Sequence, residues 1–251
     1  MFRTRFAQDI LTEFLPPTRA AKTQRAIILC DGMPSIPRKQ PLAEFLSAKG
    51  YWVFYPRYRG AWESGGEFLA RSPHLDILDV ISGLSKEFRE LAFGKRFRVS
   101  ADEVFAIGGS FGGAAAILAS LDSRVKKVVA NCAVVDWAIL RREQRKETSN
   151  PSYAAYIRAA FGLGYRLSER NWKKLFAGKF YNPAYHAVEV SPSKVMMFHA
   201  QDDPYIPYQS VRKFARVTGV RLKLLQRGGH LSMDWIVRKY WTQIREFFDS
   251  D

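Results

Sequence analysis

The segment from residue 103 to residue 119 constrains the fold most, because it reads as a strand, a tight glycine-rich turn and a helix. Its apolar start is followed by Gly108-Gly-Ser110-Phe-Gly-Gly113 and then by alanines and other apolar residues. A strand that turns sharply into a helix lifts the serine clear of the sheet, and the crowded turn requires glycine two positions before and after it. Gly108 and Gly112 meet this requirement. The segment predicts that Ser110 is an exposed nucleophile; the alternative is a tight turn with an inert serine.

Strand and helix patterns alternate along the rest of the chain, which is typical of an α/β protein with a mostly parallel sheet covered on both faces. Strands are predicted at 25–31, 50–56, 103–107, 126–130, 194–199 and, near a sheet edge, 220–225. One helix is predicted to begin at Ser72 and Pro73, and its apolar face continues to Leu91. A second helix is predicted from Ser232 to Phe248. At 251 residues the chain fits a single domain, 1–251, with a substantial core.

Strand signals disappear between about residues 137 and 192, where the sequence is first polar and then rich in aromatic residues. Such an insertion between two strands predicts a small helical cap. Candidates for an apolar substrate pocket beneath it are Trp137, Tyr156, Phe161 and Trp172. The alternative is that most of these side chains form the core of the cap itself.

A nucleophilic serine needs a base, and the base needs an orienting acid; in this arrangement they follow in the order serine, acid, histidine. His230 follows the last predicted strand and precedes the final helix, so it has the right place for the base. The acid is expected after the strand at 194–199, where Asp202 and Asp203 are neighbours, and position alone leaves both open. The remaining histidines are predicted to be structural: His74, His186 and His199.

Two backbone N–H groups are expected to hold the oxyanion that forms during acyl transfer. Phe111 supplies one, because its N–H lies at the start of the helix after the elbow. The second is expected from the loop after the first buried strand, Asp31-Gly-Met33-Pro34, where the Met33 N–H can point inward. An ordinary turn at a strand end would have the same features, so the local sequence does not decide this assignment.

Lysine and arginine exceed the acids by 39 to 24, which gives a formal charge of +15. The basic residues are spread along the chain without a long tract, so a solvated basic surface is favoured over steering of an anionic substrate, and no specific nucleic-acid partner is expected. Cys30 and Cys132 lie in apolar runs and are predicted to be buried reduced thiols. No metal or organic cofactor is implied.

No apolar run reaches the roughly 18 residues that a membrane-spanning helix needs. The N-terminus has positive charge without the apolar stretch of a secretory signal. A cytoplasmic location and no membrane partner are therefore expected. The sequence leaves the oligomeric state open, with a homo-oligomer as one option.

With these residues placed, the chain resembles the α/β-hydrolase superfamily, and within it the catalytic domain of the prolyl oligopeptidase (S9) group and related small esterases. The matching stretches are the elbow, Pro56-Arg-Tyr-Arg-Gly60 with Glu63-Ser-Gly-Gly66, His199-Ala-Gln-Asp-Asp203-Pro-Tyr-Ile-Pro207, and Gly229-His230. The resemblance covers about residues 25 to 248 apart from the cap, and it selects Asp203 as the acid. Two departures are Asp31 where the family usually has histidine before Gly32, and Ala200 in place of a glycine.

The resemblance implies an α/β-hydrolase fold and a serine hydrolase that works through an acyl-enzyme with Ser110, His230 and Asp203. A chain of this length has no room for the N-terminal β-propeller of the oligopeptidases, so a small-molecule ester or amide is a better expected substrate than a peptide. The alternatives are an S9-like peptidase or acyl-aminoacyl hydrolase, a non-catalytic binding protein on the same fold, and, from the charge alone, a protein that binds nucleic acid or anionic surfaces.

Overall fold

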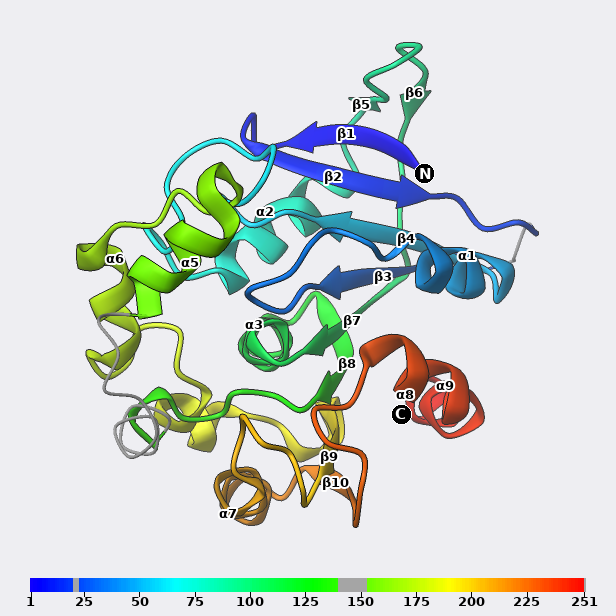
Figure 1. Ribbon diagram of the computed structural model, residues 1–251. Coiled ribbons are helices and arrows are strands. Elements are labelled where there is room, and N and C mark those ends of the chain that lie inside the picture. The colour runs from blue at the N-terminus through cyan, green and yellow to red at the C-terminus, as the bar shows by residue number, and fades with distance from the viewer. Residues whose placement is uncertain (20–22, 140–152, 251) are drawn as a thin grey trace.

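An eight-stranded sheet forms the centre of the computed structural model, which describes residues 1–19, 23–139 and 153–250 (Figure 1). Across the sheet the strands are β1 (Phe2–Phe6), β2 (Ile10–Leu15), β4 (Tyr51–Pro56), β3 (Arg25–Cys30), β7 (Glu103–Gly109), β8 (Val125–Asn131), β9 (Val195–Ala200) and β10 (Arg221–Leu225). The pairs β1–β2 and β2–β4 are antiparallel, and all others are parallel. Every strand predicted from the sequence is present, and β10 lies at a sheet edge as expected.

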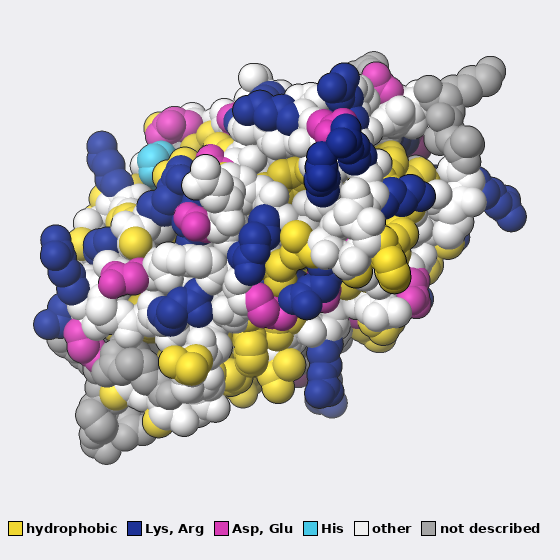
Figure 2. Space-filling model, turned by 90° about the horizontal axis from the view of Figure 1, so that it is seen from above, with side chains coloured by type: hydrophobic (Ala, Val, Ile, Leu, Met, Phe, Trp, Pro, Cys, Tyr) yellow, Lys and Arg dark blue, Asp and Glu magenta, His cyan; other side chains and the backbone are white. Residues whose placement is uncertain are grey.

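Helices cover both faces of the sheet (Figure 1). One face carries α2 (His74–Leu84), α3 (Phe111–Ala119) and α7 (Tyr208–Thr218), and the other carries α1 (Gln40–Ala48), α8 (Met233–Lys239) and α9 (Trp241–Asp249). None of the helices in residues 1–19, 23–139 and 153–250 is both apolar and long enough to span a bilayer. Lysine and arginine side chains are scattered over the face seen in Figure 2, as their spread along the sequence predicts.

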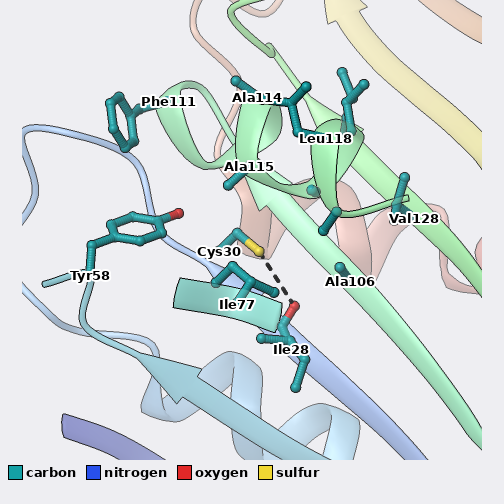
Figure 3. Packing of buried hydrophobic residues seen from close by; sticks show 14 of the residues in the cluster. Ile28, Cys30, Tyr58, Ile77, Ala106, Phe111, Ala114, Ala115, Leu118 and Val128 are labelled. Atoms are coloured by element: carbon teal, nitrogen blue, oxygen red, sulfur yellow. Dashed lines mark hydrogen bonds between the residues drawn. The ribbon is translucent and has the colours of Figure 1, made fainter. Parts of the chain in front are cut away.

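Side chains of the central strand β7 alternate between two cores, which follows from the two-residue period of a strand. Val104 and Ala106 pack beneath α2 and α3, whereas Phe105 and Ile107 pack beneath α8 and α9. The alanines of α3 allow this helix to lie close to the sheet (Figure 3). Cys30 is buried in the same cluster, and its thiol donates to the carbonyl of Ile28. Both cysteines are buried and unpaired, so this prediction is confirmed.

The insertion between β8 and β9 contains short helices in its described residues: α5 (Tyr153–Phe161), η1 (Gly162–Gly164), α6 (Glu169–Lys173), η2 (Lys174–Phe176), η3 (Pro183–Glu189) and η4 (Pro192–Lys194). The part of the predicted cap at 140–152 lies outside the described residues. Tyr181 attaches the insertion to the elbow region, because its hydroxyl donates to the Phe111 carbonyl at 2.5 Å. Within the insertion, the Trp137 indole N–H donates to the Tyr181 carbonyl at 2.8 Å.

The prediction that the helix after Pro73 continues to Leu91 is wrong for its second half. The helix begins at His74, with Ser72 bonded to the His74 ring instead of capping the helix, and ends at Leu84. Phe88 belongs to β5 (Phe88–Arg89), which pairs with β6 (Arg96–Phe97). The reason is tertiary, because the Phe88 ring packs against aromatic side chains of β1 and β2, which were not predicted as strands.

Two further differences concern helices. Helix α1 was not predicted, although its residues Leu42, Ala43 and Leu46 recur at helical spacing and are buried. The predicted C-terminal helix begins after Ser232, whose hydroxyl accepts from the Trp235 N–H, but is interrupted at Tyr240. There the backbone leaves the helical region, and the ring stacks on Phe198 with centroids 5.2 Å apart.

His74 is expected to make the stability of the protein depend on pH. Burial lowers the pKa of His74 to about 4, with smaller contributions from His186 and Arg71. The unfolded chain takes up this proton near pH 6.5, so the free energy of unfolding should fall by roughly 2 to 3 kcal/mol between about pH 6.5 and pH 4. Buried His199, whose pKa is also lowered by burial, acts in the same direction. Urea unfolding across this pH range should show a shallower fall for His74→Asn, and equal slopes in the two proteins would contradict the prediction.

Candidate active site

Ser110 stands at the junction between β7 and α3 in an unusual backbone conformation. Its φ of 54° and ψ of −118° are rarely adopted by residues other than glycine. Backbone hydrogen bonds hold it there: the Ser110 N–H donates to the Asn131 carbonyl at 2.8 Å, and the Ser110 carbonyl accepts from Gly113 and Val134, each at 3.1 Å. The serine is thus fixed at the carboxyl end of the central strand.

Close backbone approach explains why the elbow requires glycine at the two predicted positions. A Cβ on Gly108 would lie 2.1 Å from the Gly112 carbonyl oxygen, and a Cβ on Gly112 would lie 2.1 Å from the Cys30 carbonyl oxygen. Gly113 is also crowded, by the Ala133 Cβ at 2.5 Å. Gly109 differs, because its nearest contact would be an ordinary 3.6 Å to Met233.

Ser110 and His230 line the same cavity of about 620 Å³. Its walls come from the loop after β3, the elbow, the end of β8, the loop after β9, the insertion and the loop before α8. The lining residues are Asp31, Gly32, Met33, Pro34, Ser35, Lys39, Gly109, Ser110, Phe111, Asn131, Val134, Trp137, Tyr156, Trp172, Phe176, Tyr205, Ile206, His230, Leu231 and Met233. A volume of this size can hold a small organic molecule.

Asp203 is the aspartate that contacts His230. The distance from His230 Nδ1 to Asp203 Oδ2 is 2.9 Å, and Asp203 Oδ1 accepts from the backbone N–H groups of Tyr205 and Ile206 at 2.9 and 3.1 Å. Burial disfavours the charged form of Asp203, but the hydrogen bond from His230 and the two backbone donors outweigh it and lower the pKa of this carboxyl. An ionised Asp203 requires the proton on Nδ1, which leaves Nε2 of the imidazole free to accept one.

Asp202 makes different contacts from its neighbour Asp203. Its exposed carboxylate accepts from the backbone N–H groups of Gly228 and Gly229 at 3.2 and 2.9 Å, and these hydrogen bonds lower its pKa. Gly229 has a φ of +60°, in the left-handed region that favours glycine. Asp202 and this glycine pair therefore fix the path of the loop that ends in His230.

Three residues around the acid and the histidine were not assigned to the site from the sequence. Asn131, at the end of β8, donates from Nδ2 to the Leu231 carbonyl at 2.6 Å and so connects the serine elbow with the histidine loop. The Tyr205 ring meets the His230 ring edge-on, with centroids 5.3 Å apart. Cys132 lies beside Asp203; burial, and then the Asp203 charge, raise the pKa of its thiol. Asn131 could have been found from its place at a strand end beside β7.

Cys132, Asp203 and His230 are also the one group of possible metal ligands in residues 1–19, 23–139 and 153–250, with ligand atoms within 4.8 Å of one another. Metal binding requires a thiolate and a free imidazole nitrogen. Here the thiol is held protonated by burial, and the imidazole Nδ1 is bonded to the carboxylate. The arrangement fits a hydrogen-bonded acid and base better than a metal centre.

The loop after β3 is anchored through Asp31, the first residue after that strand. The Asp31 carboxylate accepts from the Gly32 N–H at 2.9 Å, from the Ser35 hydroxyl at 2.5 Å and from Tyr55, and it pairs with Lys39 Nζ at 2.9 Å. Burial, together with the Asp31 charge, raises the pKa of Tyr55 and keeps its phenol a donor. These contacts hold the loop beside the elbow, with Met33 in the cavity wall.

Aromatic side chains of the insertion form one wall of the cavity. Trp137, Tyr156 and Trp172 line it, and so does Phe176, which the sequence did not indicate. Phe161 is not among the lining residues. Its ring instead meets the Tyr165 ring edge-on at 5.8 Å.

Comparison with known protein families finds a match between residues 32–235 and the model of the alpha/beta hydrolase family. Comparison with curated proteins finds no match. Among solved structures, the chain is similar to an esterase of Pyrococcus furiosus, with a TM-score of 0.67 and 15% identity over 98% of this chain and 87% of that one. Est1E of Butyrivibrio proteoclasticus, with ferulic acid bound, gives a TM-score of 0.69 and 14% identity over the whole of both chains.

An acylaminoacyl peptidase of Pyrococcus horikoshii is similar as well, with a TM-score of 0.67 and 16% identity. That alignment covers 98% of this chain but 40% of the peptidase. At these identities the structural matches show the fold, which is the α/β-hydrolase fold that the sequence motifs implied.

Proposed function

The chain belongs to the alpha/beta hydrolase family, and on this basis we propose that it is a serine hydrolase that cleaves carboxylic esters or amides through an acyl-enzyme. The observation that carries the proposal is that the strained elbow serine and a histidine bonded to a buried aspartate line one cavity. Neither feature is needed for a stable α/β core, and together they match the demands of nucleophilic catalysis.

In the proposed reaction, Ser110 Oγ attacks the substrate carbonyl carbon while His230 Nε2 takes the hydroxyl proton. The resulting tetrahedral intermediate collapses, the bond to the alcohol or amine breaks, and the imidazolium gives its proton to the leaving group. Water then repeats the sequence on the acyl-enzyme, releasing the acid and regenerating the serine. Asp203 keeps the imidazole in the required tautomer and stabilises its charged form.

The Phe111 and Met33 backbone N–H groups are the proposed oxyanion donors. The N–H groups of the first helical turn have no acceptor within the helix, so that of Phe111 is free to serve a ligand. Met33 lies in the cavity wall on the loop that Asp31 anchors. The negative charge of the Asp31 carboxylate would disfavour an oxyanion that forms nearby. The ion pair between Asp31 and Lys39, at 2.9 Å, offsets this repulsion.

The cavity favours a small ester or amide with an apolar group. The wall formed by Trp137, Trp172 and Phe176 suits an apolar acyl or alcohol part, and the insertion that carries much of it is the proposed cap. Structural neighbours include esterases and an acylaminoacyl peptidase, so cleavage of an acyl-aminoacyl amide is the second candidate.

A fluorophosphonate probe together with Ser110→Ala tests the proposal. The protein should be labelled at one residue and should hydrolyse short-chain p-nitrophenyl esters, and Ser110→Ala should abolish both. Ser35→Ala is the matched control, because Ser35 lines the same cavity but bonds to Asp31, and it should still be labelled. Labelling that survives Ser110→Ala would exclude this nucleophile. A folded protein that is neither labelled nor active would favour the non-catalytic binding protein.

A further inference from the structure

The hairpin formed by β5 and β6 presents apolar side chains to solvent at its tip. Leu91 is 53% exposed and Phe93 is 90% exposed, with Ala92 exposed between them; we call these three residues the tip patch. The hairpin projects beyond β1, the edge strand of the sheet (Figure 1). An apolar hollow of about 480 Å³ adjoins the tip patch and is lined mainly by Met1, Phe2, Leu15 and the patch itself.

The tip patch is held in a fixed conformation. The Glu90 side chain is buried, and its carboxylate accepts from the backbone N–H groups of Ala92 at 2.6 Å and Phe93 at 2.8 Å. The Gly94 N–H donates to the Glu90 carbonyl, which closes the turn at 3.0 Å. A buried carboxylate that bonds to two backbone N–H groups orders the backbone that carries Phe93, which lowers the conformational entropy lost when the tip binds a partner.

The base of the hairpin is attached to the body of the protein. The Leu91 N–H donates to the Arg3 carbonyl at 2.8 Å, and the Thr4 hydroxyl donates to the Arg89 carbonyl at 2.7 Å. Phe88 and Phe97 turn inward and stack on each other with centroids 5.9 Å apart. The hairpin therefore has its own aromatic base, and Phe93 plays no part in it.

The hairpin and its flanking residues carry an excess of positive charge, although Arg96 pairs with Glu87 at 3.4 Å. Residues 86–98 contain five Lys or Arg against two Glu, and one of these acids is the buried Glu90. The basic side chains are all exposed: Lys86, Arg89, Lys95, Arg96 and Arg98. The proposed hydrolase reaction uses none of them. On the face seen in Figure 2, cationic side chains lie among hydrophobic ones.

We propose that the β5–β6 hairpin docks the protein on an anionic lipid surface. Phe93 and Leu91 enter the boundary between headgroups and acyl chains, while the surrounding lysine and arginine side chains contact lipid phosphates. The aliphatic Leu91 and the adjoining hollow favour lipid over single-stranded nucleic acid, which would need successive aromatic faces for stacking. The sequence predicts no membrane partner because no apolar run is long enough to span a bilayer, and that criterion does not detect a surface made of a few exposed apolar residues.

Co-sedimentation with phospholipid vesicles tests the proposal on the full chain. The protein should bind vesicles that contain equal parts of phosphatidylcholine and phosphatidylglycerol. Its affinity for vesicles of pure phosphatidylcholine should be lower by a factor of about ten or more. Phe93→Ser should lower binding to the anionic vesicles about tenfold or more. Val188→Ser is the matched control. Val188 is 94% exposed on η3, which packs against α7 near the opposite edge of the sheet. This variant should bind the anionic vesicles as tightly as the unaltered protein does.

A second pair of variants tests the charges. Lys95→Gln with Arg96→Gln should weaken binding to anionic vesicles, whereas Arg212→Gln with Lys213→Gln, two exposed residues of α7, should have little effect. Circular dichroism verifies the fold of each variant.

Three results would overturn the proposal. The first is vesicle binding that is unchanged in Phe93→Ser or equal on neutral lipid. The second is binding to single-stranded RNA without binding to vesicles. The third is a dimer that Phe93→Ser dissociates, with no vesicle binding, which would assign the tip patch to a second copy of the chain.

Discussion

Asp203→Asn is expected to lower kcat for ester hydrolysis by about 10³- to 10⁴-fold while KM changes little. The asparagine amide can donate to His230 Nδ1, and this hydrogen bond favours the tautomer with its proton on Nε2. In that tautomer the imidazole cannot take the proton of Ser110. Steady-state kinetics with a p-nitrophenyl ester measure the effect, and the loss should appear in kcat because the aspartate does not contact the substrate.

Asp202→Asn provides the matched control, since it makes the same chemical change at the neighbouring residue. An asparagine side-chain oxygen can still accept from the Gly228 and Gly229 N–H groups, so the loop keeps its path. The expected loss is therefore small beside that of Asp203→Asn. Equal losses in the two variants, or a larger loss for Asp202→Asn, would contradict the proposed roles of the two aspartates.

The residues of the proposed site could be selected from sequence because each lies beside a strong local signal. Ser110 is marked by glycines that backbone crowding requires, and His230 by its place after the last strand. The choice between Asp202 and Asp203 was different in kind. Residue type and position left both open, and the resemblance to a known family selected the one that contacts His230.

The elements that were missed depend on contacts between distant segments. Phe88 and Leu91 continue the apolar spacing of α2, so the local pattern favours helix. The Phe88 ring, however, packs against Phe6 and Phe14 of two strands that the sequence did not reveal. Those contacts exist only after β1 and β2 have joined the sheet, and a local pattern carries no information about them.

The cavity wall shows the same limit. Aromatic composition indicated which segment would contribute, but it could not separate Phe176, which lines the cavity, from Phe161, which packs on Tyr165. In the sequence alone, Asp31 stands out only as a departure from the pattern of the family that the chain resembles. Its role as an anchor requires Ser35, Tyr55 and Lys39 to meet at one carboxylate, and only the fold brings them together.

Gly112→Ala is expected to destabilise the protein by about 3 kcal/mol or more, which corresponds to a fall in Tm of roughly 6 to 12 °C. Helix propensity alone predicts the opposite sign, because alanine is favoured over glycine by about 1 kcal/mol inside a helix. The added Cβ would lie 2.1 Å from the Cys30 carbonyl oxygen and 2.4 Å from that of Asp31. Both atoms belong to backbone at the end of β3, which cannot move without disturbing its pairing with β7.

Gly109→Ala separates this clash from a general intolerance of the elbow to alanine. A Cβ on Gly109 meets nothing closer than 3.6 Å, so thermal unfolding of this variant should stay near that of the unaltered protein. If Gly112→Ala instead unfolds at the same temperature as Gly109→Ala, then α3 must be able to move away from β3. The close approach that holds Ser110 at the strand end would then not be a requirement of the fold, and the strained serine would need another cause.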